Sequence, residues 1–166
     1  PGARGGKVIA DLLFGKLSPS GKLPITFYND TADLPAFEDY SMKGRTYRYL
    51  ESAPLYPFGY GLSYGNADIL SVECNGQKVA AGASVAVDTA AGMSIKVEVE
   101  NKSAMELGEV VQVYIKDMDS KFATTWGKLC GFARVTVPAG GKATVAVPMD
   151  VDAFTVVNDE GKKFVD

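Results

Sequence analysis

The chain has 166 residues, of which 46% are hydrophobic and 22% charged, and its formal net charge is −3. Such a composition is typical of a globular protein with one large domain or two small ones, while the acidic balance and scattered lysines exclude electrostatic binding of nucleic acid. No stretch approaches the roughly 18 apolar residues of a membrane span, and the absence of histidine excludes Ser-His-Asp catalysis and the commonest zinc sites.

The first predicted element is an amphipathic helix over residues 7–14. A glycine-rich turn at residues 1–6 precedes it, and apolar pairs four residues apart lie on one of its faces. Gly15 suits the position just after the helix, and Pro19 prevents its continuation. Because the chain opens with Pro1-Gly2 rather than with Met, we expect it to begin inside a longer protein or after processing.

Two short strands are predicted in the next segment. Residues 23–28 are apolar and aromatic, and Pro24 lies near the start, where a missing ladder donor matters least. Residues 29–43 have the Asp, Pro and aromatic content of a loop, and residues 45–50 then alternate like a strand. A helix that leads into a strand indicates a fragment of an α/β domain.

Residues 54–64 combine aromatics, prolines and glycines more densely than a plain strand or a solvated linker needs. Proline fixes its own φ, and Gly59 and Gly61 permit turns or close approaches, so this path is irregular but rigid. Four rings in nine residues, from Tyr56 to Tyr64, are expected to pack against a neighbouring surface. The segment is predicted to be a structural corner between two domains, with a ligand surface as the alternative.

A domain boundary is predicted near Gly65, because seven of the eight tyrosines lie between Tyr28 and Tyr64. Beyond it the period of the apolar residues becomes two, in runs around residues 95–100, 111–116, 129–137 and 143–147, with a turn at 138–141. Strands that recur at this spacing predict an antiparallel β-sandwich of immunoglobulin or fibronectin type III shape.

Four residues form the candidate ligand site: Asp39, Tyr40, Arg45 and Tyr47. Aromatic faces and charge-assisted donors are what sugar rings and hydroxyls accept. The alternative is structural: Arg45 and Arg48 stack on these tyrosines and pin the loop.

Two carboxylate pairs, Glu38–Asp39 and Asp117/Asp119, are candidates for general acid/base work, but adjacent acids on a loop are usually solvated. Cys74 and Cys130 are expected to be free thiols. Two triplets that begin at Asn29 and Asn101 match the glycosylation sequon.

Several ordered motifs resemble the closing part of family 3 glycoside hydrolases. They are residues 1–6, 9–15, 19–27 and 56–64, followed by 108–115 and 129–135, which resemble the fibronectin type III-like module of those enzymes. Residues 34–42 and 44–49 look more like the β-xylosidase-type branch than the average β-glucosidase.

The resemblance implies a mainly β chain in which the end of an α/β sandwich domain, residues 1–64, precedes a fibronectin type III-like β-sandwich, residues 65–166, that lacks its last strand. It implies a parent enzyme that hydrolyses β-linked sugars with retention, through two carboxyl groups about 5–5.5 Å apart. Neither carboxyl group matches a motif in this chain, so the chain alone is expected to be inactive.

The expected partners are therefore the upstream catalytic domains, in the same protein or in another chain, and through them a β-linked saccharide. No cofactor or metal is expected. The competing hypothesis is a free-standing carbohydrate-binding or adhesion module that uses the tyrosine-rich segment as a sugar platform.

Overall fold

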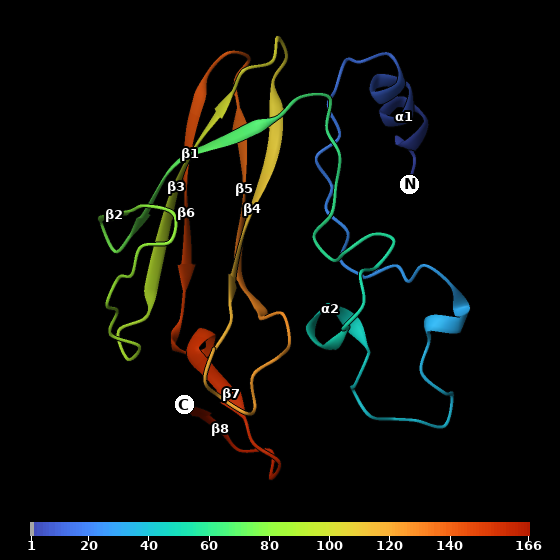
Figure 1. Cartoon of the computed structure of the whole chain (residues 1–166). Coiled ribbons are helices and arrows are strands. Elements are labelled where there is room, and N and C mark those ends of the chain that lie inside the picture. Colours follow the sequence, from blue (N-terminus) through green and yellow to red (C-terminus); the bar gives the residue numbers. More distant parts are fainter. Residues whose placement is uncertain (1) are drawn as a thin grey trace.

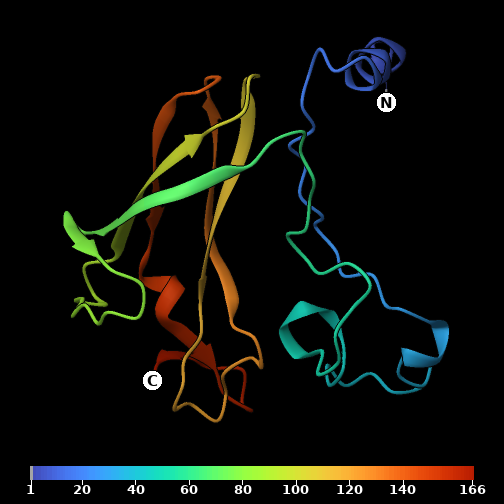
Figure 2. The same cartoon turned by 45° about the horizontal axis from the view of Figure 1, so that its top comes forward.

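The computed structural model describes residues 2–166; Pro1, the first residue of the predicted glycine-rich turn, lies outside the described residues. The chain forms an irregular N-terminal segment beside a β-sandwich (Figures 1 and 2). Within residues 2–166, no helix is both long enough and apolar enough to cross a membrane.

The N-terminal segment contains little regular structure. Its elements are α1 (Gly5–Leu13), a 3-10 turn (Thr31–Asp33) and the single-turn helix α2 (Thr46–Tyr49). The predicted helix over residues 7–14 is confirmed, and Gly15 adopts the left-handed φ of +67° that ends it.

The strand predicted over residues 23–28 is wrong. Figure 1 shows this stretch running alongside residues 55–60, but the two are joined only by an isolated bridge between Phe27 and Tyr56 and by a few backbone hydrogen bonds. Pro54 and Pro57 lack the N–H groups that a longer ladder would need. The pairing therefore stays irregular.

The strand predicted over residues 45–50 is also wrong, because this stretch forms α2. A helical turn places Tyr47 and Leu50, three residues apart, on the same side, where both contact the β-sandwich. Leu50 is 5% exposed there. Contacts with the β-sandwich thus favour a helical turn here, although the alternation of residues 45–50 predicts a strand.

The β-sandwich consists of antiparallel strands. One sheet has the order β2-β1-β3-β6, and its strands are β1 (Ala67–Cys74), β2 (Gln77–Val79), β3 (Met93–Asn101) and β6 (Lys142–Met149). The opposite sheet pairs β4 (Leu107–Ile115) with β5 (Lys128–Val137), and a small hairpin, β7 (Thr155–Val157) and β8 (Lys163–Val165), closes the chain. The predicted antiparallel sandwich is confirmed.

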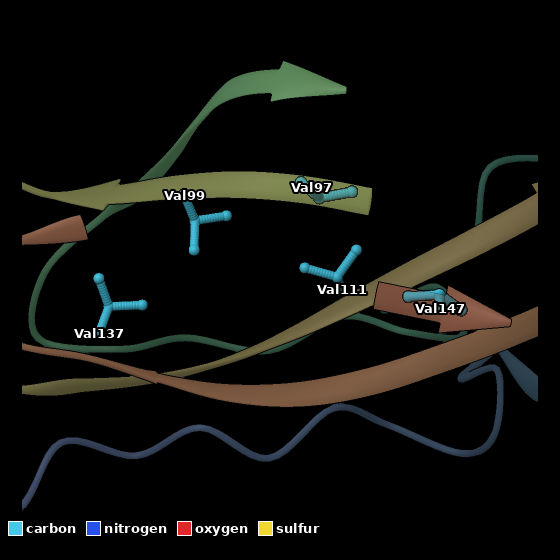
Figure 3. Close-up of a cluster of buried hydrophobic side chains, with 5 residues drawn as sticks. All are labelled: Val97, Val99, Val111, Val137 and Val147. Carbon is cyan, nitrogen blue, oxygen red and sulfur yellow. The ribbon is translucent and has the colours of Figure 1, made fainter. Parts of the chain in front are cut away.

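Five valines form the centre of the core, between the two sheets (Figure 3). They are Val97 and Val99 of β3, Val111 of β4, Val137 of β5 and Val147 of β6, and each is at most 8% exposed. Burial of each side chain contributes on the order of 1.5–3 kcal/mol. The sequence runs in which every second residue is apolar therefore contain the valines that hold the two sheets together.

The N-terminal segment lies against the outer face of β4 and β5 (Figure 2). Lys22 forms an ion pair with Glu109 of 2.9 Å, and the Arg134 guanidinium donates to Ser20 Oγ at 3.3 Å. The Gln112 amide donates to the carbonyl of Gly59 at 3.5 Å. The aromatic segment 54–64 thus takes part in the contact between the two parts of the chain.

The four rings of this segment differ in their packing. Phe58 stacks on Tyr47, but Tyr56, Tyr60 and Tyr64 remain 43%, 37% and 54% exposed. The expectation that all four rings would pack against a neighbour is therefore met most fully by Phe58. Elsewhere, Cys74 and Cys130 are free thiols, as expected.

Candidate functional site

The loop at residues 36–45 carries three of the four predicted site residues. Arg45 lies at its end and donates from Nε to the carbonyl of Ser41 at 3.0 Å, and from Nη2 to the carbonyls of Asp39 and Ala36. The guanidinium group has five N–H donors in a fixed plane, which suits it to hold several carbonyls at once. Arg45 therefore shapes the loop from within, by hydrogen bonds rather than by stacking on tyrosines.

The carboxylate of Asp39 closes a tight turn in this loop. One of its oxygens accepts from the backbone N–H of Ser41 at 2.8 Å. That N–H, the Ser41 side chain and the positive charge of Arg45 together lower the pKa of Asp39 below its usual range. Asp39 is therefore an anion and an acceptor at neutral pH.

The side chain next to Asp39 projects into solvent. Tyr40 is 89% exposed, and Phe37 in the same loop is 88% exposed. Two exposed aromatic rings beside a fixed anion form the kind of surface that a sugar ring can stack on while its hydroxyls donate to the carboxylate.

Tyr47, the fourth predicted residue, has protein partners on both its ring and its hydroxyl. Its ring stacks on Phe58 with 4.2 Å between centroids and meets Tyr114 edge to face at 6.1 Å. Its hydroxyl oxygen accepts from the backbone N–H of Leu129 at 2.9 Å. The Arg48 guanidinium lies 5.8 Å from the centroid of the Tyr47 ring. The structure thus places Tyr47 between the two parts of the chain, apart from Asp39 and Tyr40.

Two cavities meet at Tyr47 and Phe58, which line both. One, of about 600 Å³, lies toward the loop and is also lined by Met42 and Arg45. The other, of about 590 Å³, lies toward the β-sandwich and is also lined by Trp126. The sequence did not predict that Trp126 lines this cavity, because nothing in the order of residues shows that its indole N–H reaches the carbonyl of Leu50.

Asp117, of the second predicted carboxylate pair, stabilises a turn. Asp117 accepts from the backbone N–H groups of Ser120 and Asp119, each at 3.0 Å, and these contacts lower its pKa. A general acid needs the opposite shift, toward neutral pH. Over residues 2–166, no group of three or more His, Cys, Asp and Glu side chains is placed to hold a metal ion.

We expect the pKa of Asp39, measured by NMR titration of the chain, to lie below that of aspartate in an unstructured peptide. The turn contact with Ser41 is then fully present above about pH 4 and is lost as the pH falls through the lowered pKa of Asp39. In Asp39→Asn an acceptor oxygen remains but no proton is exchanged, so the Ser41 amide shift should not titrate. A pKa for Asp39 at or above the peptide value would contradict this account.

Two known domains match the chain. Residues 1–64 match the glycosyl hydrolase family 3 C-terminal domain, and residues 109–165 match the fibronectin type III-like domain. The chain is 41% identical over 154 residues to a xylan 1,4-beta-xylosidase of Xylanibacter ruminicola, a match that covers 93% of this chain and 16% of that protein. It is 34% identical to a periplasmic beta-glucosidase of Salmonella typhimurium, over 97% of this chain and 22% of that protein.

Solved structures agree with these matches. A family 3 beta-glucosidase of Bifidobacterium adolescentis superposes with a TM-score of 0.76 at 31% identity, over 98% of this chain and 24% of that one. The chain thus spans about a fifth of the length of the relatives it matches. The order of the two matched domains follows the order of the two parts of the fold. The chain therefore belongs to glycoside hydrolase family 3, of which it carries the C-terminal domain and a fibronectin type III-like domain.

Proposed function

We propose that the chain is the structural C-terminal part of a retaining β-glycosidase that hydrolyses β-xylosides or β-glucosides. In this proposal residues 1–64 complete the α/β sandwich domain and residues 65–166 form the fibronectin type III-like domain. Two relatives of the chain are named as a xylan 1,4-beta-xylosidase and a beta-glucosidase, which supports these two substrate classes.

Both catalytic carboxyl groups lie outside residues 1–166 in this proposal. A retaining glycosidase uses one carboxylate as a nucleophile and one carboxylic acid, with a raised pKa, as a proton donor. Asp39 and Asp117, one acid from each carboxylate pair, instead have lowered pKa values because backbone N–H groups hold their charged forms. They stabilise turns, and neither is suited to donate a proton at neutral pH.

The exposed apolar face of α1 supports contact with further domains. Ile9 and Leu13 of α1 are 53% and 78% exposed, Phe14 just after the helix is 81% exposed, and Leu62 in the same part of the chain is 70% exposed. A single exposed apolar residue is ordinary, but a helix face of this kind is typical of a surface that another element covers. We propose that the catalytic domains of the longer enzyme cover it.

The observation that carries the proposal for this chain is the shape of the loop at residues 36–45. Arg45 holds the loop, while Asp39 and Tyr40 remain exposed to solvent. We propose that Asp39, Tyr40 and Arg45 form part of the rim of the sugar site, and that Tyr47, which contacts Phe58, Tyr114 and Leu129, supports the loop indirectly.

The test is an assay on aryl β-xyloside and β-glucoside, with the 166-residue chain alone and with the longer protein that contains it. We expect no turnover by the chain and turnover by the longer protein. In the longer protein, Tyr40→Ala should raise KM by about tenfold, equivalent to the loss of about 1.4 kcal/mol of binding. Phe132→Ala removes another exposed ring, 67% exposed on β5, and is the matched control with an unchanged KM.

Turnover by the chain alone would overturn the assignment of the catalytic groups to other residues. An equal KM for the Tyr40 and Phe132 variants would contradict the proposal that the loop at residues 36–45 belongs to the sugar site. If the longer protein turned over neither substrate, the proposed activity itself would be wrong.

A further inference from the structure

We infer that the fibronectin type III-like domain sets the position of the sugar-site loop at residues 36–45, and that it does so through α2. This inference rests on the proposed function for the role of the loop, but its structural part stands on contacts alone. Tyr47 and Trp126 are then positioning residues, which act on the ligand through Asp39 and Tyr40.

The first step is the attachment of α2 to the fibronectin type III-like domain. The backbone N–H of Leu129, in β5, donates to the hydroxyl oxygen of Tyr47 at 2.9 Å, and the indole N–H of Trp126 donates to the carbonyl of Leu50. Leu50 is the residue that ends α2. The two contacts thus hold the helix at its second residue and at its C-terminal end.

Ring packing strengthens this attachment. The Tyr47 ring lies between Phe58, which stacks on it, and Tyr114 of β4, which meets it edge to face. Offset-stacked and edge-to-face pairs are the favoured arrangements of aromatic rings. Because Tyr47 is held at its ring and at its hydroxyl, its position relative to β4 and β5 is well determined.

The second step joins α2 to the loop. Arg45 is the residue immediately before α2, and its guanidinium donates to the carbonyls of Ala36, Asp39 and Ser41. The hydroxyl of Tyr28, which lies outside α2, also donates to the carbonyl of Gly44 at 3.0 Å and holds the end of the loop next to Arg45. A shift of α2 would therefore carry Arg45 and the turn at Asp39 with it.

The residue between these two steps has a strained backbone. Thr46 has a φ of +53°, in the left-handed region that a β-branched side chain rarely adopts. Such a conformation persists only where the surroundings hold it, and here Arg45 is fixed on one side and Tyr47 on the other. The strain indicates that the loop and the fibronectin type III-like domain constrain each other at this point.

The structural test is hydrogen exchange on the whole 166-residue chain. Tyr47→Phe removes the acceptor of the Leu129 N–H but keeps the ring, and Trp126→Phe removes the donor to Leu50. Tyr64→Phe is the matched control, because the Tyr64 hydroxyl donates to the carbonyl of Leu12, far from the loop in the chain, at 2.9 Å. We expect the amides of residues 38–45 to exchange roughly 2- to 10-fold faster in the first two variants and at the original rate in the control.

Equal exchange in all three variants would overturn the inference. Faster exchange throughout the β-sandwich would overturn it as well, because the variants would then have loosened the whole domain rather than the loop. This measurement involves no substrate, so its outcome does not depend on the proposed glycosidase activity.

The functional test uses the longer protein. We expect Tyr47→Phe to raise KM for the aryl glycoside several-fold with little change in kcat, and Tyr64→Phe to leave both unchanged. If Tyr40→Ala raises KM but Tyr47→Phe does not, the positioning role is wrong while the sugar site stands. If exchange becomes faster but Tyr40→Ala leaves KM unchanged, the attachment of the loop is supported and its place in the sugar site is wrong.

Discussion

Replacement of Asn101 by alanine should lower the free energy of unfolding by about 3–5 kcal/mol, because several buried backbone groups would lose their partners at once. Asn101 ends β3 and is 0% exposed. Its amide nitrogen donates to the carbonyls of Met105, Val137 and Pro138 at 2.8–3.2 Å. Its amide oxygen accepts from the backbone N–H and the hydroxyl of Ser103. One side chain thus joins the end of β3 to the following loop and to the end of β5.

The other sequon asparagine provides the matched control. Asn29 is exposed and donates once, to the carbonyl of Ala53 at 2.7 Å, so Asn29→Ala should cost about 1 kcal/mol or less. Asn101→Asp separates lost hydrogen bonds from lost volume, because it keeps the shape but turns an acceptor oxygen toward three carbonyls. We expect it to destabilise at least as much as alanine in chemical denaturation at neutral pH. Losses at Asn101 no larger than at Asn29 would show that the buried network contributes little.

The second large effect is expected from Gly61→Ala, in the aromatic segment. A Cβ at this position would overlap the carbonyl oxygen of Gly21 and lie 3.2 Å from its carbonyl carbon. Backbone cannot rotate away as a side chain can, so residues 21–23 and 59–61 must separate. That separation strains the hydrogen bonds between Leu23 and its partners Gly59 and Tyr60, both 2.8 Å long. We expect a loss of about 3 kcal/mol in the stability of the N-terminal segment.

Gly21→Ala is the control for this variant. Its own Cβ would meet no other atom within 4 Å, and its φ is not in the left-handed region, so no loss is expected. Hydrogen exchange of residues 19–27 and 55–64, read separately from that of β3 to β6, measures the effect where it should occur. Protection that is equal in the two glycine variants would show that the close approach at Gly61 is not a constraint.

Local pattern was sufficient for α1 and for the long strands. The helix has apolar pairs four residues apart and a glycine after its end, and both signals act within one stretch of chain. The strands β3 and β6 alternate strictly because one face of each lies on the valine core and the other faces solvent. Whether each of these residues faces the core or the solvent therefore follows from its place in the local alternation.

Local pattern failed at residues 23–28 and 45–50, where partners distant in sequence decide the conformation. Prolines in the facing stretch limit residues 23–28 to a single bridge. Residues 45–50 form a helical turn because Tyr47 and Leu50 both find partners in the fibronectin type III-like domain, at Leu129 and Trp126. Six alternating residues are too few to outweigh such contacts.

In the candidate site, too, some contacts join residues close in sequence and others join residues that are far apart in the chain. Residue types and short spacing predicted Asp39, Tyr40 and Arg45 as candidates, and the contacts that Asp39 and Arg45 make within the loop span fewer than ten residues. The contacts of Tyr47 with Leu129 and of Leu50 with Trp126 span 82 and 76 residues. No local signal marks pairs at that separation.

The sequence by itself thus determined the sandwich, the helix before it, the relationship to family 3 and the loop that carries the candidate sugar-site residues. These depend on periodicity, on turn-forming residues and on ordered motifs, all of which are local. Only the tertiary structure decided that the aromatic segment leaves three of its rings partly exposed, that Tyr47 faces the fibronectin type III-like domain, and that Trp126 holds α2. The physical reason is that the direction of a side chain at a junction is chosen by the surface it meets, and that surface is formed by residues remote in the chain.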